Sequence, residues 1–323
     1  MSGGRTNLPS KREMCTSKLI PVCSPSQASV PTALALGSFD GLHAGHRRVI
    51  EAITNTNKGV PTVVTFWPHP REVLYEETRL RIDMPSEKAY LLKSLNVQQL
   101  ILISFTKTLA QLSAEDFVKK MLLKTLKAKK IAVGQNFRFG RNREGDAHLL
   151  KEIANKENVE VCIIPILKDQ KGRMSSSRIR KALNDGELNI AKQLMGRPYR
   201  LQGKVVPGRG LGNSIGWPTA NLEIEGRKFL PGIGVYSAWA WIKDNQIKFP
   251  AVMNLGPQPT VDPQAPSALE VHLLDQEIDL KGSELIIEPV KRLRGQHRFK
   301  DLQELSNQIK LDALLAKETL RAS

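Results

Sequence analysis

The pattern of apolar residues changes near residue 196, and this change constrains the fold more than any other feature of the sequence. From residue 32 to about 192, short β-rich runs alternate with amphipathic helical stretches. Such repeats build a parallel sheet with helices on both faces. After residue 196 short strands follow one another without helices, which favours an antiparallel barrel. The sequence therefore predicts an α/β plus β protein: a doubly wound parallel domain, then an antiparallel β-barrel with a C-terminal helix.

The expected elements follow from the period and length of the apolar runs. The first domain is expected to have strands at 32–36, 61–66, 99–105, 130–133 and 160–167, with helices at 45–56, 86–95, 113–126 and 147–158. The second is expected to have strands at 199–206, 235–242, 247–254, 269–274 and 285–293, then a helix at 300–322. We expect a disordered tail over 1–30, one domain over 31–190 and another over 196–323.

The composition limits the kinds of binding partner and the cellular compartment that we expect for this protein. Lys and Arg number 48 against 32 Asp and Glu, a net charge of +16, so the partner should be nucleic acid, a membrane surface or phosphorylated small molecules. No apolar run approaches the ~20 residues of a membrane helix, which excludes a transmembrane protein. Cys15, Cys23 and Cys162 contain no C-x-x-C pair, which argues against a disulfide framework or structural zinc. We expect a reducing, cytoplasmic setting; the basic, acid-poor N-terminus leaves a plastid transit peptide, and hence the stroma, as the alternative.

The first candidate site follows the first expected strand. Residues 37–46 read Gly-Ser-Phe-Asp-Gly-Leu-His-Ala-Gly-His. Gly37 and Gly41 permit a tight turn, and His43 and His46 face the same way at the start of a helix. That helix start attracts phosphate, and the two imidazoles can donate further hydrogen bonds to phosphoryl oxygens. The arrangement suits attack on a nucleotide α-phosphate; the alternatives are incidental surface histidines or a zinc site, which would need a third ligand.

These residues resemble the H-x-G-H signature of the nucleotidyltransferase superfamily. In the longer form G-x-F-D-G-x-H-x-G-H they resemble the prokaryotic bifunctional riboflavin kinase/FMN adenylyltransferases, or FAD synthetases. Residues 65–70, 134–140 and 173–180 are similar to that family's T-F-x-P-H-P, G-x-[DN]-F-x-F-G and R-x-S-S-[ST]-x-I-R motifs. The resemblance implies a Rossmann-like nucleotidyltransferase domain that binds ATP through Gly37, Phe39, Asp40, His43, His46, Arg173, Ser176, Ser177 and Arg180. It implies flavin binding by His69, Asn136 and Phe137.

The serine run at 175–177 also has an interpretation that needs no family. It supplies hydroxyl and N–H groups at a helix start, where Arg178 or Arg180 can serve as a bidentate phosphate clamp. The alternative is an ordinary helix cap with solvated arginines.

The second candidate site begins in a glycine-rich stretch. Five glycines between residues 203 and 216 permit a backbone that wraps phosphate oxygens, although a hairpin without a ligand has the same composition. Thr219 and Asn221 share one side of an extended chain, so their oxygens can hold magnesium against phosphate. Glu270 alternates with Leu269 and Val271 and therefore faces away from one apolar set.

Residues 203–221 are similar to the riboflavin-kinase signature G-x-x-x-G-x-x-[IL]-G-[FWY]-P-T-A-N. Residues 234–236, 254–260 and 270–275, with Arg294 followed by Phe299, resemble its remaining motifs. Two positions depart from the family pattern, with Asn213 in place of Arg and Lys281 in place of Tyr. The resemblance implies Glu270 as general base, flavin binding by Glu270 and Arg294, Mg²⁺ on Thr219 and Asn221, and ATP binding by Gly208, Gly210, Gly216, Thr219 and Asn221.

The function implied is FAD biosynthesis. The barrel would phosphorylate riboflavin with Mg-ATP, and the first domain would adenylylate FMN, with His43, His46 and Glu270 as catalytic residues. Riboflavin, FMN and ATP are then the partners, flavin is substrate and product rather than a prosthetic group, and neither a specific nucleic acid nor a membrane is expected. Asn213 and Lys281 leave open a monofunctional FMN adenylyltransferase with a weak kinase barrel. A nucleic-acid-binding or flavin-responsive regulator is the alternative from another class, and self-association into a homo-oligomer stays open.

Overall fold

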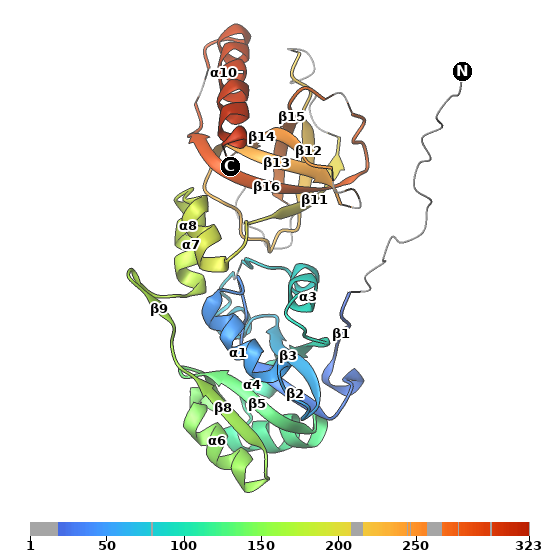
Figure 1. The fold of residues 1–323 in the computed structure, drawn as a ribbon, viewed down its shortest axis with the longest axis vertical. Helices are drawn as coiled ribbons and strands as arrows, with labels where there is room; N and C mark the ends of the chain where they lie inside the picture. Colours follow the sequence, from blue (N-terminus) through green and yellow to red (C-terminus); the bar gives the residue numbers. More distant parts are fainter. Residues whose placement is uncertain are drawn as a thin grey trace, which may run out of the picture.

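The computed structural model describes residues 19–78, 80–207, 216–243, 245, 247–256, 267–276, 278–297 and 299–322. A parallel sheet with its helices forms one part and a closed barrel forms the other, and α7 (Ser176–Asn184) and α8 (Leu188–Met195) lie between them (Figure 1). The predicted fold class is confirmed: a doubly wound domain precedes an antiparallel barrel and a C-terminal helix.

The parallel sheet has the strand order β1-β4-β3-β2-β5-β8. Strand β2 is buried along its whole length, as expected of a central strand covered on both faces. The order of strands reverses between β2 and β5, and ligands bind such sheets at the carboxyl ends of the strands that flank this point. The bounds are β1 Val22–Cys23, β2 Thr32–Leu36, β3 Val60–Trp67, β4 Gln99–Ser104, β5 Ala128–Gly134 and β8 Glu160–Ile164.

The four predicted helices of this domain are present within a few residues. They are α1 Ala44–Thr54, α3 Pro85–Lys93, α5 Ala114–Asp116 continuing into the π-helix η2 Phe117–Thr125, and α6 Ala147–Lys156. Several short elements were not predicted because one turn or one residue pair gives no period to detect. These are η1 Pro25–Gln27, α2 Pro70–Tyr75, α4 Lys107–Ala110, η3 Arg141–Arg143 and the paired strands β6 Arg138–Phe139 with β7 Gly145–Asp146 and β9 Lys168–Asp169 with β10 Gly172–Arg173.

The expectation of a disordered tail up to residue 30 is wrong for its second part. Strand β1 pairs in parallel with β4, with Val22 opposite Leu100. The Gln99 side chain binds the backbone of Ser29 twice, through Ser29 N at 3.0 Å and Ser29 O at 2.8 Å. This segment is held by tertiary contacts to β4 rather than by an apolar run of its own, so composition alone did not identify it.

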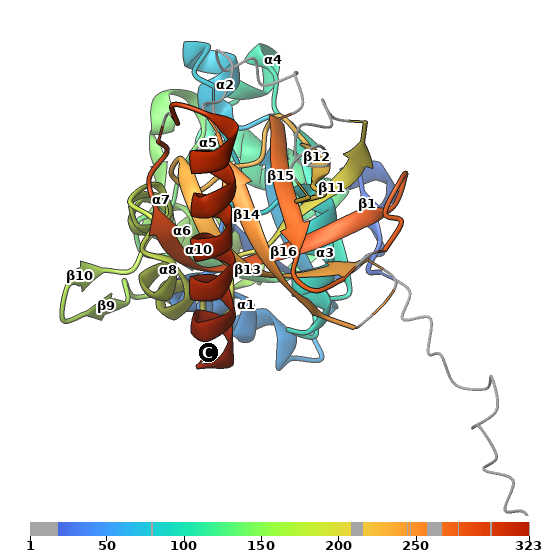
Figure 2. The ribbon, with the colours of Figure 1, turned by 90° about the horizontal axis from the view of Figure 1, so that it is seen from above.

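The barrel closes in the order β11-β12-β15-β14-β13-β16 with antiparallel neighbours. Its strands are β11 Leu201–Val206, β12 Ala220–Ile224, β13 Gly234–Ile242, β14 Phe249–Leu255, β15 Ser267–Leu273 and β16 Glu284–Arg294. Strand β12 was missed, since it begins inside the Pro-Thr-Ala-Asn motif and is only five residues long. The C-terminal helix α10 (Leu302–Arg321) lies against β13, β14 and β16 (Figure 2).

Helices α7 and α8 join the two parts. Their apolar residues Ile179, Leu183 and Leu194 share one buried cluster with Leu201 and Tyr236 of the barrel. The chain leaves α8 at Gly196, whose φ of 67° is the left-handed conformation that ends many helices. The predicted boundary between 190 and 196 therefore falls at the end of α8 in sequence, while the packing links both helices to the barrel.

Candidate active sites

The histidine pair lies at the predicted place, the start of α1 beyond the carboxyl end of β2. His43 is the N-cap residue of α1, and its Nδ1 accepts a hydrogen bond from the His46 backbone N–H at 3.3 Å. The two rings stack with centroids 3.7 Å apart, and Phe39 packs edge-on against His46 at 5.3 Å. The stack confirms that the two histidines share one face, as their spacing indicated.

Both histidines are held in the neutral form. Burial lowers the pKa of His43 to about 4, with the charges of Arg173 and Arg47 acting in the same direction. Burial, then the neighbouring His43, Lys88 and Arg173, lower the pKa of His46 well below its usual value. Because Nδ1 of His43 accepts a hydrogen bond, the neutral ring carries its proton on Nε2. The site therefore offers imidazole N–H donors and not imidazolium charges.

This neutrality gives a pH dependence of stability. The unfolded chain protonates His43 near pH 6.5, whereas the folded chain does so only near pH 4. Between these values the unfolded chain binds more protons, so stability falls as the pH falls, by up to ~1.4 kcal/mol per pH unit for one histidine. We expect His43→Asn, which keeps an N-cap acceptor, to flatten the dependence of the urea midpoint on pH between 4 and 6.5. An unchanged slope in this variant would contradict the assignment.

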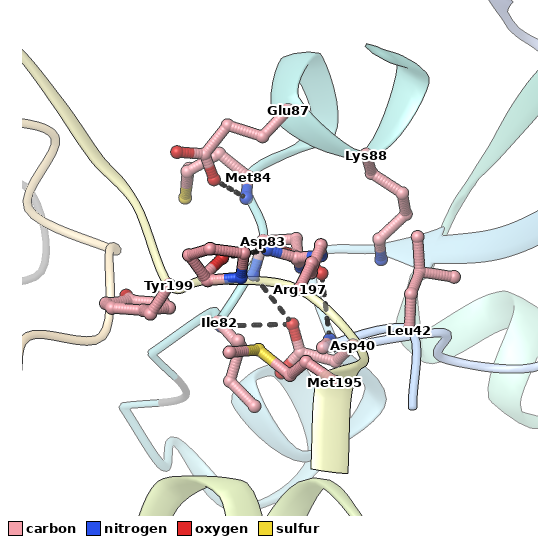
Figure 3. Close-up of polar contacts among 12 residues, drawn as sticks. Asp40, Leu42, Ile82, Asp83, Met84, Glu87, Lys88, Met195, Arg197 and Tyr199 are labelled. Carbon is pink, nitrogen blue, oxygen red and sulfur yellow. Dashed lines mark hydrogen bonds and ion pairs between the residues drawn. The ribbon is translucent and has the colours of Figure 1, made fainter. Parts of the chain in front are cut away.

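Asp40, expected to bind ATP, holds the loop in place. It is buried, and its Oδ1 accepts hydrogen bonds from the N–H groups of Ile82 at 3.0 Å and Asp83 at 3.2 Å (Figure 3). Its Oδ2 pairs with the guanidinium of Arg180. The backbone carbonyl of Asp40 accepts from the Ser176 hydroxyl at 2.8 Å. Asp40 thus joins the signature loop to the segment before α3 and to the start of α7, and its contact with ATP stays a prediction.

Some polar residues at the start of α7 hold the structure together, and others are available to bind a ligand. Ser175 caps the helix, Ser177 is exposed, and Arg173 on β10 is near enough to the histidine pair to lower both pKa values. Arg178 binds Asp169 with two hydrogen bonds of 2.9 and 3.0 Å, so it fixes the β9–β10 hairpin rather than serving as a free clamp. Arg180 keeps Nη1 buried and without a partner in the described part of the chain, and that donor remains for an oxygen ligand.

The residues expected to bind flavin lie at the ends of β3 and β5. His69 caps α2, with its Nδ1 accepting from the Arg71 N–H at 3.1 Å. Asn136 is exposed, and Phe137 stacks on the buried Phe139 with ring centroids 5.5 Å apart. At the end of β3, a cavity of about 40 Å³ is lined by residues that include His69, Lys88 and Ser176. The fold thus gathers at one edge of the sheet four motifs that are far apart in sequence.

The second site is built across three neighbouring barrel strands. Glu270 on β15 lies opposite Asn221 on β12 and opposite Asn254 on β14. Its neighbours Leu269 and Val271 are in the barrel core, so Glu270 and the two asparagines are on the outer face. The Asn254 amide donates to Glu270 Oε2 at 3.1 Å. This confirms the predicted direction of the Glu270 side chain.

The side-chain oxygen Oδ1 of Asn254 in turn accepts a hydrogen bond from the side-chain amide of Gln296 at 2.6 Å. The sequence has Asn254 within a motif but indicates no role for it, and no pattern in the sequence distinguishes Gln296. Only the pairing of β14 with β15 brings Asn254 beside the carboxylate, and a residue just before the C-terminal helix gives no local signal.

The nucleotide side of this site is described in part. Thr219 and Lys281 line a cavity of about 660 Å³ at one end of the barrel, together with Val205, Pro207, Val271 and Asp279. Gly216 has a φ of 78°, in the region that favours glycine. Gly208, Gly210 and Asn213 lie outside the described residues.

Arg294, expected to bind flavin, holds α10 against the barrel. Its Nε and Nη2 bind the buried Asp312 at 2.8 to 3.1 Å, and its Nη1 donates to the Gly295 carbonyl at 3.0 Å. A flavin contact by Arg294 stays a prediction.

Removing one partner of this buried pair should be costly because the other charge is left without compensation. We expect Asp312→Ala to lower the free energy of unfolding by about 3 kcal/mol, measured by urea titration. The control is Asp275→Ala, which removes an exposed ion pair to Lys317 and should change it by less than about 1 kcal/mol. Equal effects of the two substitutions would contradict the structural role of Asp312.

Two further observations concern membrane-spanning helices and metal-binding clusters of side chains. None of the described helices is both long and apolar enough to cross a bilayer. Within the described ranges, no three His, Cys, Asp or Glu side chains gather in a way that could hold a metal ion.

Comparison with known proteins gives a match for each part. The FAD synthetase family model matches residues 26–178, and the riboflavin kinase family model matches residues 195–320. A bifunctional riboflavin kinase/FMN adenylyltransferase of Escherichia coli is 35% identical over 289 residues, covering 88% of this chain and 91% of its own. One of Pseudomonas fluorescens is 33% identical over 285 residues, covering 87% and 91%. A crystal structure described as a macrolide-efflux protein from Streptococcus pneumoniae has a TM-score of 0.79 and 29% identity, covering 93% of this chain and 99% of its own.

Proposed function

The chain belongs to the family of bifunctional riboflavin kinases/FMN adenylyltransferases, and we propose how its residues divide the two reactions of FAD biosynthesis. The barrel phosphorylates riboflavin with ATP to give FMN, and the doubly wound domain adenylylates FMN to FAD and releases pyrophosphate. Both family models match, and this favours two activities over the monofunctional alternative.

In the barrel, Glu270 is the general base. It takes the proton of the ribityl hydroxyl while that oxygen attacks the γ-phosphorus of ATP and ADP leaves. Support comes from the outward direction of Glu270 and from the chain of hydrogen bonds through Asn254 to Gln296, which orients the carboxylate. Thr219, beside the cavity at the barrel end, is the candidate ligand of the ATP phosphates.

Magnesium would be held with ATP by Thr219 and Asn221. Hydroxyl and amide oxygens are ligands suited to this hard cation, which binds few protein groups and takes the rest of its shell from phosphate and water. Asn221 lies opposite Glu270 on the neighbouring strand, so the ion would be close to the base. When bound, the ion neutralises charge on the phosphates.

In the doubly wound domain, a phosphate oxygen of FMN attacks the α-phosphorus of ATP, and the bond to the β-phosphate breaks to release pyrophosphate. No covalent enzyme intermediate is needed. Neutral His43 and His46 donate hydrogen bonds to the phosphoryl oxygens, while Arg173 and the free Nη1 of Arg180 supply positive charge. We assign His69, Asn136 and Phe137 to the flavin side of this site.

One observation carries this division: the two sites stand on different sheets and have no described residue in common. It is tested by chromatography of flavins after incubation with Mg-ATP and either riboflavin or FMN. We expect FAD from both substrates, with transient FMN from riboflavin. FAD from FMN alone would support a degenerate kinase barrel and turn attention to Asn213 and Lys281, and no turnover would contradict both assignments.

We also propose a reducing, cytoplasmic setting for the enzyme. Support comes from Cys23 and Cys162, which are free thiols in the described structure. The net charge of +16 then favours the binding of anionic small molecules, namely ATP and FMN with its phosphate.

A further inference from the structure

A segment of the first domain, residues 81–88, is held between the barrel and the signature loop at 37–43. On the barrel side, Arg81 forms a bridge with Lys228 in the turn that follows β12. The Arg81 N–H donates to the Arg227 carbonyl at 2.7 Å, and the Phe229 N–H donates to the Arg81 carbonyl at 2.7 Å. The backbone of the segment is thus paired with the barrel as a short piece of strand.

The Lys228 side chain strengthens this attachment. Its ammonium donates to the Ile82 carbonyl at 2.8 Å and to both oxygens of Glu87 at 2.8 and 2.6 Å. Lys228 is only 3% exposed and lies 4.9 Å from the centre of the Tyr199 ring. An ammonium group whose donors are all used in a buried place is a fixed link rather than a surface charge.

A second link comes from Arg197, which pairs with Asp83 at the entry to the barrel. Asp83 is 2% exposed, and its other oxygen accepts from the Gly41 N–H of the signature loop at 3.0 Å. One carboxylate therefore connects the barrel entry with the loop that precedes the histidines (Figure 3).

The other contacts of the segment also reach this loop. Asp40 accepts from the backbone of Ile82 and Asp83, and the Lys88 ammonium donates to the Ser38 carbonyl at 2.8 Å. Burial lowers the pKa of Lys88, against the opposite pull of Asp40 and Asp83. Residues 82–88 thus contact the loop directly, while the links from Lys228 and Arg197 attach the same segment to the barrel.

We propose that Lys228, a barrel residue, is a positioning residue for the adenylylation of FMN. It fixes segment 82–88, and this segment fixes the loop that leads to His43 and His46. Lys228 is not part of the kinase machinery, because it follows the end of β12 whereas Thr219 directly precedes that strand and Asn221 is its second residue. The inference rests on the function proposed above for the two sites.

The test is Lys228→Met in the full chain, which keeps most of the side-chain volume and removes the ammonium. FAD formation from added FMN and phosphorylation of riboflavin are measured separately. We expect kcat for adenylylation to fall by about 10- to 100-fold, since small displacements of catalytic groups have effects of this size. The KM values for FMN and ATP should change less, and riboflavin phosphorylation should stay within about twofold. Lys291→Met, at an exposed lysine of β16, is the matched control and should change neither activity.

Further variants separate positioning from a general loss of stability. Lys228→Arg should restore most of kcat because a cation again reaches Glu87, and Arg197→Met should reproduce the selective loss through Asp83. Should Lys228→Met fail to fold, these two variants carry the test. Unchanged adenylylation, or equal loss of both activities in folded protein, would overturn the inference. Absence of FAD formation in the unmodified enzyme would instead overturn the proposed function.

Discussion

His46→Ala is expected to reduce FAD formation from FMN by about 10²- to 10³-fold and to leave riboflavin phosphorylation within about twofold. The range is that of losing one preorganised donor to a developing charge. His46 is neutral, and its ring centroid lies 3.7 Å from that of His43. Its Nδ1 is buried without a partner in the described structure, so this nitrogen makes no hydrogen bond that holds the fold together. The measurement is the initial rate of each reaction with Mg-ATP, followed by flavin chromatography.

The control for this prediction is His148→Ala. His148 is exposed on α6 and belongs to neither site, so both rates should stay unchanged. Thermal unfolding of both variants shows whether a loss is chemical. A folded His46→Ala enzyme that still makes FAD at the original rate, or that loses both reactions, would refute the division into two sites.

Glu270→Gln should have the opposite effect. We expect riboflavin phosphorylation to fall by about 10²- to 10⁴-fold, the range for loss of a general base, with FAD formation from FMN unchanged. Glutamine keeps an oxygen that can accept the Asn254 hydrogen bond of 3.1 Å, so the hydrogen-bonded chain to Gln296 persists while the base is lost. The rate of FMN plus FAD formation from riboflavin measures the effect.

Glu223→Gln provides the matched control, because Glu223 is an exposed carboxylate on the neighbouring strand β12, away from Asn254. It should leave both rates unchanged. If Glu270→Gln phosphorylates riboflavin normally, the base is another group, and if it also loses adenylylation in folded protein, the sites are not independent.

The sequence by itself determined the fold class, the order of the two domains and the position of the histidine pair. Periods of apolar residues are local properties, and so are the spacing of His43 and His46 and the alternation around Glu270. These features depend on geometry within one helix turn or one strand. They were therefore readable before any tertiary contact was known.

Only the tertiary structure decided how the polar residues of the motifs are used. Asp40 and Arg180 are 140 positions apart and form an ion pair, and Arg294 is held by Asp312 of the C-terminal helix. Local patterns cannot tell a free arginine from one whose partner lies far along the chain. For the same reason, the sequence did not predict strand β1, the Asn254 contact with Glu270 or the link from Lys228 to the signature loop. Each exists because folding brings distant segments together, and at Lys228 this happens in a buried place, where an unpaired charge would be costly.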